Sequence, residues 1–362
     1  MPTDPNAFLY LFFEPIAPFL DDPDVSEIMI NGPDRIYVER RGRIESTNAC
    51  FCSENALRAA AMNVARSVGR MLGEENPILE ARLPDGSRLE AVIPPLSRTG
   101  TVVSIRKFRK EKLTPAELVR FGSISEGGVR LIETIVRLHK NLVVSGATSS
   151  GKTSVLNVLS GIIDPGERIL VIEDASELQL QQPHTVRFET RKPDKDGKGE
   201  VTIRDLLIAA LRLRPDRLVI GEVRGGEALD LLEALNTGHA GSMSTIHANT
   251  PLDTLSRLET CTLLSGIDIP MPAVRAMVAG AIGVIIQTAR LSDGSRKITH
   301  ISEVLGLEEG VYKMQDIYVF RPEGLAPDGK VAGHHVFTGA TPRFAEEARR
   351  LNLPEPWADE RA

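Results

Sequence analysis

The sequence has few cysteines, few aromatic residues and no excess of positive charge. Its three cysteines, Cys50, Cys52 and Cys261, form no Cys-x-x-Cys pair, which argues against a disulfide framework and against a structural zinc site. Aromatic residues make up 4% of the chain, and the formal net charge is −6. Direct nucleic-acid binding, which uses base stacking and a positive field, is therefore not indicated.

Long apolar runs are also missing. No uninterrupted apolar stretch approaches the roughly 20 residues that a membrane-spanning helix needs. The first residues, MPTDPNAFLYLFFEP, contain an apolar patch but lack the basic segment that precedes it in a secretory signal. Basic residues cluster at RKFRKEK, residues 106–112, which we interpret as a solvated linker. We expect a cytosolic protein that associates with a membrane only through partners.

What is present divides the chain into two domains. Residues 1–108 are typical of a small α+β domain, residues 109–125 of a linker, and residues 126–362 of a larger α/β domain. In the first domain, a helix capped by Ser53 is predicted over residues 53–72. The segments that predict its strands are RIYVERRGRI with an Arg-Gly turn, ARLPDGSRLEAVIPP with a Pro-Asp-Gly turn, and TVVSIRKF.

The second domain alternates short apolar strands with helices. Such runs are typical of a parallel sheet that is covered on both faces. The strand candidates are NLVVSG, RILVIED, RLVIGE, SMSTIHA and GVIIQT, followed by RKITHISEVLGL and GVYKMQDIYVF as a meander. Residues 191–200 are expected to form a polar loop, and the tail from residue 321 is turn-rich with a short helix near residues 344–351.

The segment GATSSGKT, residues 146–153, has the spacing of a phosphate-binding loop between a strand and a helix. Gly146 and Gly151 let backbone N–H groups converge on phosphate oxygens. Lys152 places a positive charge against the β- and γ-phosphates, and the Thr153 hydroxyl suits Mg²⁺. The loop predicts that ATP and Mg²⁺ bind here. The other nucleotide contacts expected from this loop are Ala147, Thr148, Ser149, Ser150 and Ser154.

Two later strands end in acids. RILVIEDASE ends at Glu173 and Asp174, and RPDRLVIGEVR ends at Glu222 after Gly221, where a Walker B strand commonly has aspartate. Ligands of an open parallel sheet bind at the carboxyl ends of its strands, so these carboxylates are expected beside the phosphate loop. Glu222 suits the metal side, and spacing leaves open whether Glu173 or Asp174 positions the attacking water.

Two histidines bracket the strand in GHAGSMSTIHAN. His239 and His247 are therefore candidates for a sensor of the γ-phosphate. No cysteine or acid is spaced to make them a metal site. A purely structural role for each histidine stays open, because histidine often packs inside proteins without contacting a ligand.

These four segments, in this order, resemble the Walker A loop, acidic box, atypical Walker B strand and histidine box of the secretion ATPase superfamily. That superfamily drives type II and type IV secretion and type IV pilus assembly. The likeness is strongest with the ATPases of tight-adherence pilus assembly, in stretches such as VIEDASELQLQQPHTVRFETR, and it covers roughly residues 20–320. The tetracysteine zinc element that is typical of type II secretion members is missing.

The resemblance implies a homo-hexameric ring whose nucleotide lies between a PAS-like N-terminal domain and a RecA-like domain. It implies Glu173 as the base that activates water and Glu222 as the acid on the magnesium side. Arg88 and Arg106 match arginines that reach the phosphates, and Arg224 is a candidate coupling residue. Arginines supplied from another domain suit phosphoryl transfer, which builds negative charge on the equatorial oxygens. Action within or across subunits stays open.

We therefore expect an ATP-hydrolysing motor that assembles, or retracts, a tight-adherence pilus through an inner-membrane platform protein at the cytoplasmic face of that membrane. A type IV secretion or conjugative-transfer ATPase shares every motif and stays open as the alternative. A RecA-like nucleic-acid motor is disfavoured by the acidic, aromatic-poor composition. A nucleotide switch without turnover is disfavoured because Glu173 and Glu222 are both present.

Overall fold

The computed structural model describes residues 7–108, 113–180, 182–193 and 197–358. The chain forms two compact units, Met1–Glu111 and Lys112–Ala362. Residues 109–112, within the predicted basic linker, lie outside the described residues. The flanking Lys107 belongs to the first unit, because its Nζ donates to the carbonyl oxygens of Phe19 and Asp22 at 3.1 and 2.6 Å.

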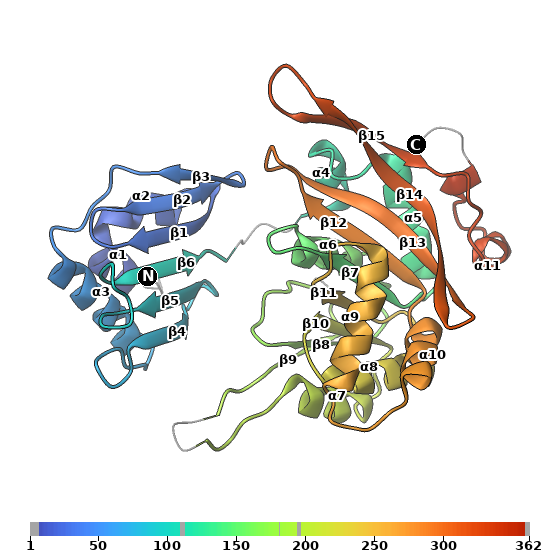
Figure 1. Ribbon diagram of the computed structural model, residues 1–362, viewed down its shortest axis with the longest axis horizontal. Helices are drawn as coiled ribbons and strands as arrows, with labels where there is room; N and C mark the ends of the chain where they lie inside the picture. The colour runs from blue at the N-terminus through green and yellow to red at the C-terminus, as the bar shows by residue number, and fades with distance from the viewer. Residues whose placement is uncertain (1–6, 109–112, 181, 194–196, 359–362) are drawn as a thin grey trace. The chain divides into compact units, whose positions relative to one another are not determined.

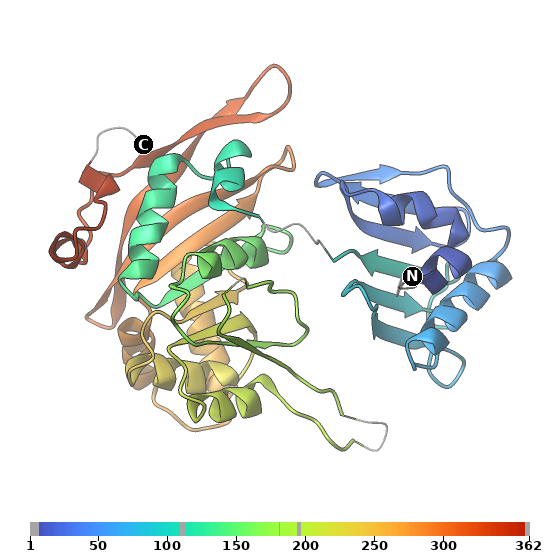
Figure 2. The ribbon, with the colours of Figure 1, turned by 180° about the vertical axis from the view of Figure 1, so that it is seen from behind.

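The amino-terminal unit is an antiparallel sheet with helices on one face (Figures 1 and 2). The strand order is β3-β2-β1-β6-β5-β4. Its strands are β1 (Val25–Asn31), β2 (Ile36–Arg40), β3 (Arg43–Ser46), β4 (Ile78–Arg82), β5 (Arg88–Val92) and β6 (Val102–Arg106). Its helices are α1 (Ala7–Phe12), the 3₁₀ turn η1 (Glu14–Ile16), α2 (Ala17–Asp21) and α3 (Glu54–Ser67).

Alternation of buried and exposed side chains builds the core of this unit. Ile28, Leu89 and Ile105 point to the helical face and pack with Leu57 of α3 in one apolar cluster. Ser53 caps α3, as predicted. The helix ends at Ser67 rather than near residue 72, because Gly69 follows in the left-handed region at φ +71°.

A buried aromatic contact orients the segment before α3. Phe51 is buried and packs edge-on against Phe13, with ring centroids 5.9 Å apart. Its neighbours Cys50 and Cys52 point outward and are exposed, whereas Cys261 in the second unit is buried.

The carboxy-terminal unit contains a nine-stranded sheet in the order β15-β14-β13-β12-β7-β11-β10-β8-β9. The strands from β12 to β9 run parallel, and β13, β14 and β15 continue the sheet antiparallel. The strands are β7 (Leu142–Gly146), β8 (Ile169–Glu173), β9 (Thr185–Glu189), β10 (Arg217–Val223), β11 (Met243–Ile246), β12 (Val284–Arg290), β13 (Arg296–Glu308), β14 (Val311–Leu325) and β15 (Val331–Phe337).

Helices cover the parallel strands on both faces (Figures 1 and 2). Two separate apolar clusters result, because successive strand residues such as Val171 and Ile172 face opposite ways and are both buried. The helices are α4 (Pro115–Arg120), α5 (Glu126–Arg137), α6 (Lys152–Gly161), α7 (Ile203–Leu211), α8 (Glu227–Asn236), α9 (Pro251–Leu263), α10 (Met271–Ala281), α11 (Ala345–Arg350) and the 3₁₀ turn η2 (Pro356–Ala358).

The predicted fold class, an α/β ATPase domain after a smaller α+β domain, is confirmed. The predicted strands and the tail helix are present, but the prediction that the tail from residue 321 is turn-rich was wrong. β14 continues to Leu325 and pairs with β15, so residues 321–337 form a hairpin. Within the described ranges, none of the helices combines the length and apolar character needed to cross a membrane.

Candidate nucleotide site

The phosphate loop connects β7 to α6 as the sequence predicts. Gly146 closes β7, and Lys152 opens α6. Three loop residues have positive φ: Gly146 at +156°, Ser149 at +60° and Gly151 at +99°. Such a backbone turns several N–H groups inward at a helix N-terminus, which is an arrangement suited to an anion. A Cβ at position 146 would lie 2.3 Å from Oγ1 of Thr288, so only glycine fits there.

Lys152, the first residue of α6, is 8% exposed. Its Nζ donates to the carbonyl oxygens of Gly146 at 3.1 Å and Ala147 at 3.0 Å, and lies 3.3 Å from Nδ1 of His247. The ammonium group therefore rests on the rim of the loop. The remaining predicted contacts, Thr148, Ser149, Ser150, Thr153 and Ser154, occupy the loop and the first turn of α6.

Glu222, near the end of β10, lies between the side chains of Arg224 and His247. Glu222 Oε2 accepts from Arg224 at 2.5 Å, and its Oε1 lies 2.8 Å from Nε2 of His247. The contact between Glu222 Oε1 and His247 is close but is not an aligned hydrogen bond, because Oε1 has no hydrogen-bond partner among the described residues. Arg224 also reaches Asp174 at 3.4 Å. The predicted residues Lys152, His247, Glu222 and Arg224 thus form one continuous chain of contacts.

The contacts of His247 indicate which of its two ring nitrogens carries the proton. A lysine ammonium only donates, so Nδ1 of His247 is the acceptor in its contact with Lys152, and Nε2 carries the proton of the neutral imidazole. Burial and the charge of Lys152 lower the pKa of His247 below its ordinary 6.5, against the opposite effect of Glu222. His247 is therefore neutral near pH 7.

Glu173 is the more deeply placed of the two acids after β8. Its side chain is 3% exposed, and its Oε1 accepts from the backbone N–H groups of Glu177 and Leu178, each at 2.9 Å. Oε2 is buried without a hydrogen-bond partner among the described residues. Burial raises the pKa of Glu173 above 4.5, although the two N–H groups oppose the shift. A buried carboxylate with one unused oxygen suits a proton acceptor.

His239 does not join these residues within one chain. It precedes β11, whereas His247 follows it, and β11 runs parallel to β7. The two histidines therefore lie at opposite edges of the sheet. Nδ1 of His239 lies 3.2 Å from the carbonyl oxygen of Ala234 near the end of α8. A nucleotide contact by His239 therefore stays a prediction, and within one chain it does not share the edge of the sheet that carries the phosphate loop.

The predicted arginines are neighbours in the amino-terminal unit. Arg88 begins β5 and Arg106 ends β6, and the two are register partners. Arg82 at the end of β4 pairs with Arg88, which makes a row of three cations on adjacent strands. Arg82 was not among the predicted site residues, although the predicted hairpin places it opposite Arg88. Like charges directly opposite one another are unfavourable, and on its other side Arg106 faces an acid, Glu27 of β1, as register partner.

Oxygen ligands are available for a magnesium ion. Thr153 and Glu222 supply a hydroxyl and a carboxylate, which are hard ligands that Mg²⁺ accepts. In the described ranges, no group of three or more His, Cys, Asp or Glu side chains could hold a metal by itself. A magnesium ion that is held mainly by nucleotide phosphates takes one or two protein ligands.

Contacts from β12 and β13 to the loop were not foreseen. Thr288 Oγ1 donates to the carbonyl oxygen of Ser145 at 2.9 Å and lies 2.8 Å from Oγ of Ser150. Arg296 donates from Nε to the carbonyl oxygen of Ser149 at 2.9 Å. The only sequence signal was a pair of polar residues, Gln-Thr, at the end of the apolar strand GVIIQT.

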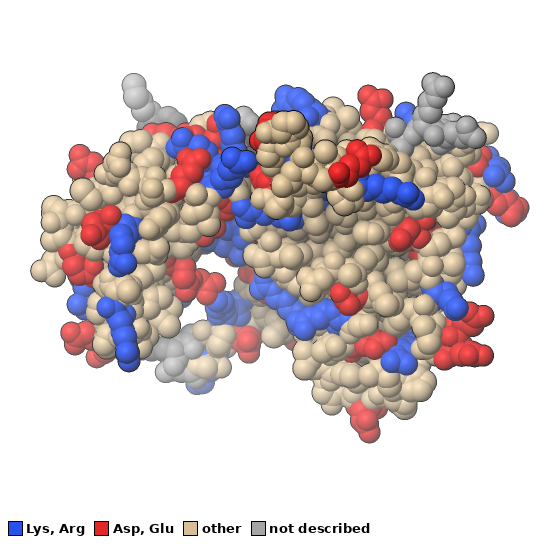
Figure 3. Space-filling view, turned by 45° about the horizontal axis from the view of Figure 1, so that its top comes forward, with Lys and Arg blue, Asp and Glu red and all other residues tan. Residues whose placement is uncertain are grey.

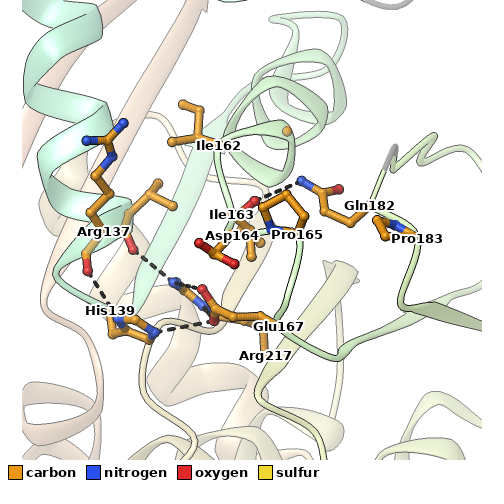
Figure 4. Close-up of a pocket in the computed structure, with 12 residues that line it drawn as sticks. Arg137, His139, Ile162, Ile163, Asp164, Pro165, Glu167, Gln182, Pro183 and Arg217 are labelled. Atoms are coloured by element: carbon orange, nitrogen blue, oxygen red, sulfur yellow. Dashed lines mark hydrogen bonds and ion pairs between the residues drawn. The ribbon is translucent and has the colours of Figure 1, made fainter.

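A pocket of about 660 Å³ lies at the opposite end of α6 (Figure 4). Arg217, 1% exposed, donates to both carboxylate oxygens of Glu167 at 2.5 and 3.0 Å and to the carbonyl oxygen of Val136. His139 lies 3.3 Å from the same carboxylate. None of the predicted nucleotide residues lines this pocket. Three of its charged or titratable side chains, Arg217, Glu167 and His139, thus contact one another.

A match to a protein-family model shows to which family the chain belongs. Residues 12–318 match the model described as type II/IV secretion system protein. The chain belongs to this family. The fold of this secretion ATPase also resembles the X-ray structure of the Legionella pneumophila ATPase DotB, at 20% identity and a TM-score of 0.57, over 82% of this chain and 81% of that one. The pilus retraction motor PilT with bound ADP is similar at 20% identity and a TM-score of 0.53, over 95% and 86%.

Relatives match the secretion ATPase along most of its length. A Mycobacterium tuberculosis (strain CDC 1551 / Oshkosh) protein named "Putative conjugal transfer protein" is 35% identical over 325 residues, 88% of this chain and 91% of the relative. The type IV secretion system protein VirB11 of Bartonella quintana (strain Toulouse) is 32% identical over 334 residues, 82% and 92%. The predicted superfamily and the predicted ATP hydrolase are confirmed. These relatives are not named for tight-adherence pili, which the sequence analysis preferred.

Proposed function

We propose that this secretion ATPase powers a type IV secretion or conjugal-transfer machine. The observation that carries the proposal is the match to a relative named for conjugal transfer over 88% of this chain and 91% of the relative. The order of preference from the sequence analysis is thereby reversed. A tight-adherence pilus motor is the second candidate, which the stretch VIEDASELQLQQPHTVRFETR favours.

We also propose how the chain is assembled and placed. It works as a homo-hexamer at the cytoplasmic face of the inner membrane, on a platform protein, and binds no nucleic acid itself. Acidic and basic side chains are intermixed on the face shown in Figure 3. This face therefore gives no support to a basic track for a nucleic-acid backbone.

In the proposed reaction, the phosphate loop and Lys152 bind the triphosphate, and Thr153 and Glu222 hold Mg²⁺. Magnesium neutralises charge on the β- and γ-phosphates when it is bound. Glu173 accepts a proton from water as the water oxygen bonds to the γ-phosphorus. The bond from that phosphorus to the β-phosphate oxygen breaks, which gives ADP and phosphate.

The amino-terminal arginines complete the proposed cycle. Arg88 and Arg106 stabilise the charge on the transferring group, and loss of the γ-phosphate releases them. The two units then separate about the segment that joins them, downstream of Lys107. Staggered cycles around a ring would deliver a stroke to the membrane platform.

A biochemical experiment tests the ATPase motor. We expect the purified protein to hydrolyse ATP and to become larger on a sizing column with a non-hydrolysable ATP analogue. Lys152→Ala should lower kcat by at least about 100-fold, because it removes a phosphate-facing charge from a partly dry site. Glu222→Gln should still bind nucleotide but not hydrolyse it. Normal hydrolysis by Glu222→Gln would refute its assignment.

A genetic experiment separates the two candidate machines. The gene is deleted and complemented with the wild type or with Lys152→Ala, and conjugative DNA transfer, protein secretion and surface pilin are measured. Loss of transfer or secretion with intact surface pilin supports the first candidate. Loss of surface pilin alone supports the pilus motor instead.

A further inference from the structure

Gln287 is a buried polar residue outside the four predicted motifs. It lies near the carboxyl end of β12 and is 3% exposed. Its Oε1 accepts a hydrogen bond from Oγ of Ser145, the residue before the phosphate loop. Its Nε2 donates to the carbonyl oxygens of Ala248 at 3.1 Å and Asn249 at 3.0 Å. Both ends of one amide are therefore used.

The order of the strands in the sheet shows which segments the hydrogen bonds of Gln287 connect. β7 lies between β12 and β11, so β12 and β11 are not neighbours. The Gln287 side chain spans the end of β7 and reaches the backbone that directly follows β11. That backbone carries His247, next to Ala248. One side chain thus connects three strand ends at the edge where the nucleotide site lies.

The adjacent residue strengthens the same connection. Thr288 contacts Ser145 and Ser150 of the phosphate-loop region at 2.9 and 2.8 Å. Gln287 and Thr288 together connect β12 to Ser145, just before the loop, and to Ser150 within it, whereas of the two only Gln287 extends to the segment after His247. A fully satisfied buried polar group holds its partners in one geometry, because every alternative leaves a polar atom unpaired.

We infer that Gln287 is a positioning residue that couples the phosphate loop to His247. Nδ1 of His247 lies 3.3 Å from Lys152, and Nε2 lies 2.8 Å from Glu222. These distances depend on the position of the backbone at residues 247–249, which Gln287 holds. When the loop moves to accept or release phosphates, Ser145 and the His247 segment move together. This inference rests on the proposed roles of Lys152 and Glu222 and on the predicted role of His247 as a sensor of the γ-phosphate.

A double-mutant cycle in the full-length protein tests the coupling. Gln287→Met keeps the length of the side chain and removes all three bonds. We expect it to lower kcat about 10- to 100-fold, the usual cost of losing a partner that orients a reactive group. In the His247→Ala background, the same change should have no further effect on kcat. Binding of a fluorescent ADP analogue should change by less than about threefold.

Gln182→Met is the matched control. Gln182 is also a buried amide of this unit, and its Nε2 donates to Ser160 and Ile163 at the far end of α6. This variant should keep the wild-type kcat. Gln287→Glu is a second test if Gln287→Met does not fold, since it keeps the acceptor for Ser145 and removes the two donors. It should show the same dependence on His247.

The outcomes separate this inference from the proposed function. Independent, multiplicative losses in kcat from Gln287→Met and His247→Ala would overturn the coupling while leaving the ATPase intact. A normal kcat in Gln287→Met or Gln287→Glu would overturn it as well. A wild-type protein without ATPase activity would instead refute the proposed function.

Discussion

The missing side chain at Gly221 makes room for Glu173. A Cβ at position 221 would lie 2.9 Å from Cγ of Glu173, which is closer than such atoms approach. The glycine that replaces the usual Walker B aspartate therefore has a packing reason. It lets a buried acid from β8 lie against β10.

We expect Gly221→Ala to displace Glu173 and to lower kcat by at least about tenfold, while nucleotide affinity changes little. Steady-state kinetics and equilibrium binding of a fluorescent nucleotide measure the two effects. Gly161→Ala is the control, because a Cβ there meets no atom within 4 Å. Equal kcat values for the two variants would contradict this packing argument.

The raised pKa of Glu173 predicts an acid limb in the pH–rate profile, which is a fall in kcat at low pH. Burial shifts its pKa above the ordinary 4.5, so the base becomes protonated at a higher pH than an exposed glutamate. The value of kcat should fall on acidification with an apparent pKa above 4.5. The limb should persist in His247→Asn, whose residual activity is measured from pH 5 to 8. Loss of the limb in that variant would assign it to His247.

At the scale of elements, β10 begins with a buried charge. Arg217 forms a two-pronged ion pair with Glu167 and also bonds the carbonyl oxygens of Val136 and Gly241. Burial would raise the pKa of Glu167, but the bonds and charge of Arg217 lower it overall. The pair thus fixes the start of β10 to α5 and to the segment before β8.

Breaking this pair should destabilise the unit strongly. Arg217→Met leaves Glu167 without its partner, so we expect a loss of about 3–5 kcal/mol in the free energy of unfolding. The double variant Arg217→Met, Glu167→Leu should recover part of that loss. Urea unfolding monitored by circular dichroism measures both. A double variant less stable than the single one would contradict the argument.

The sequence predicted those elements whose pattern is local. Continuous apolar runs identified the buried parallel strands, and the rule for strand ends brought Glu173 and Glu222 to one edge. β9 was missed because it is an edge strand with only Val186 and Phe188 as apolar residues. The sequence motif did not show that His239 and His247 lie at opposite ends of β11, because two residues of one motif can flank a strand.

Contacts between distant segments were not predictable. Gln287, Thr288 and Arg296 reach the phosphate loop from more than 130 positions away along the chain. Pairing of this kind depends on the folded sheet, and no local pattern in the sequence encodes it.

At the scale of the whole molecule, the proposed site needs residues from both units. Arg88→Ala should lower kcat about 10³-fold or more, as for other arginines that contact a transferring phosphoryl group. Our proposed cycle has both units of one subunit close on one nucleotide. Mixing Arg88→Ala with Lys152→Ala protein should then restore no activity. Recovery of ATPase activity in the mixture would show that Arg88 acts on a neighbouring subunit.

The positions of the three thiols allow the native protein to be labelled with a dye on one unit only. Cys50 and Cys52 are exposed, whereas Cys261 is buried and burial raises its pKa. A maleimide dye reacts with accessible thiolates, so it should attach to the amino-terminal unit alone. Energy transfer from that dye to a fluorescent nucleotide would test the proposed closure of the two units on the nucleotide without an engineered cysteine.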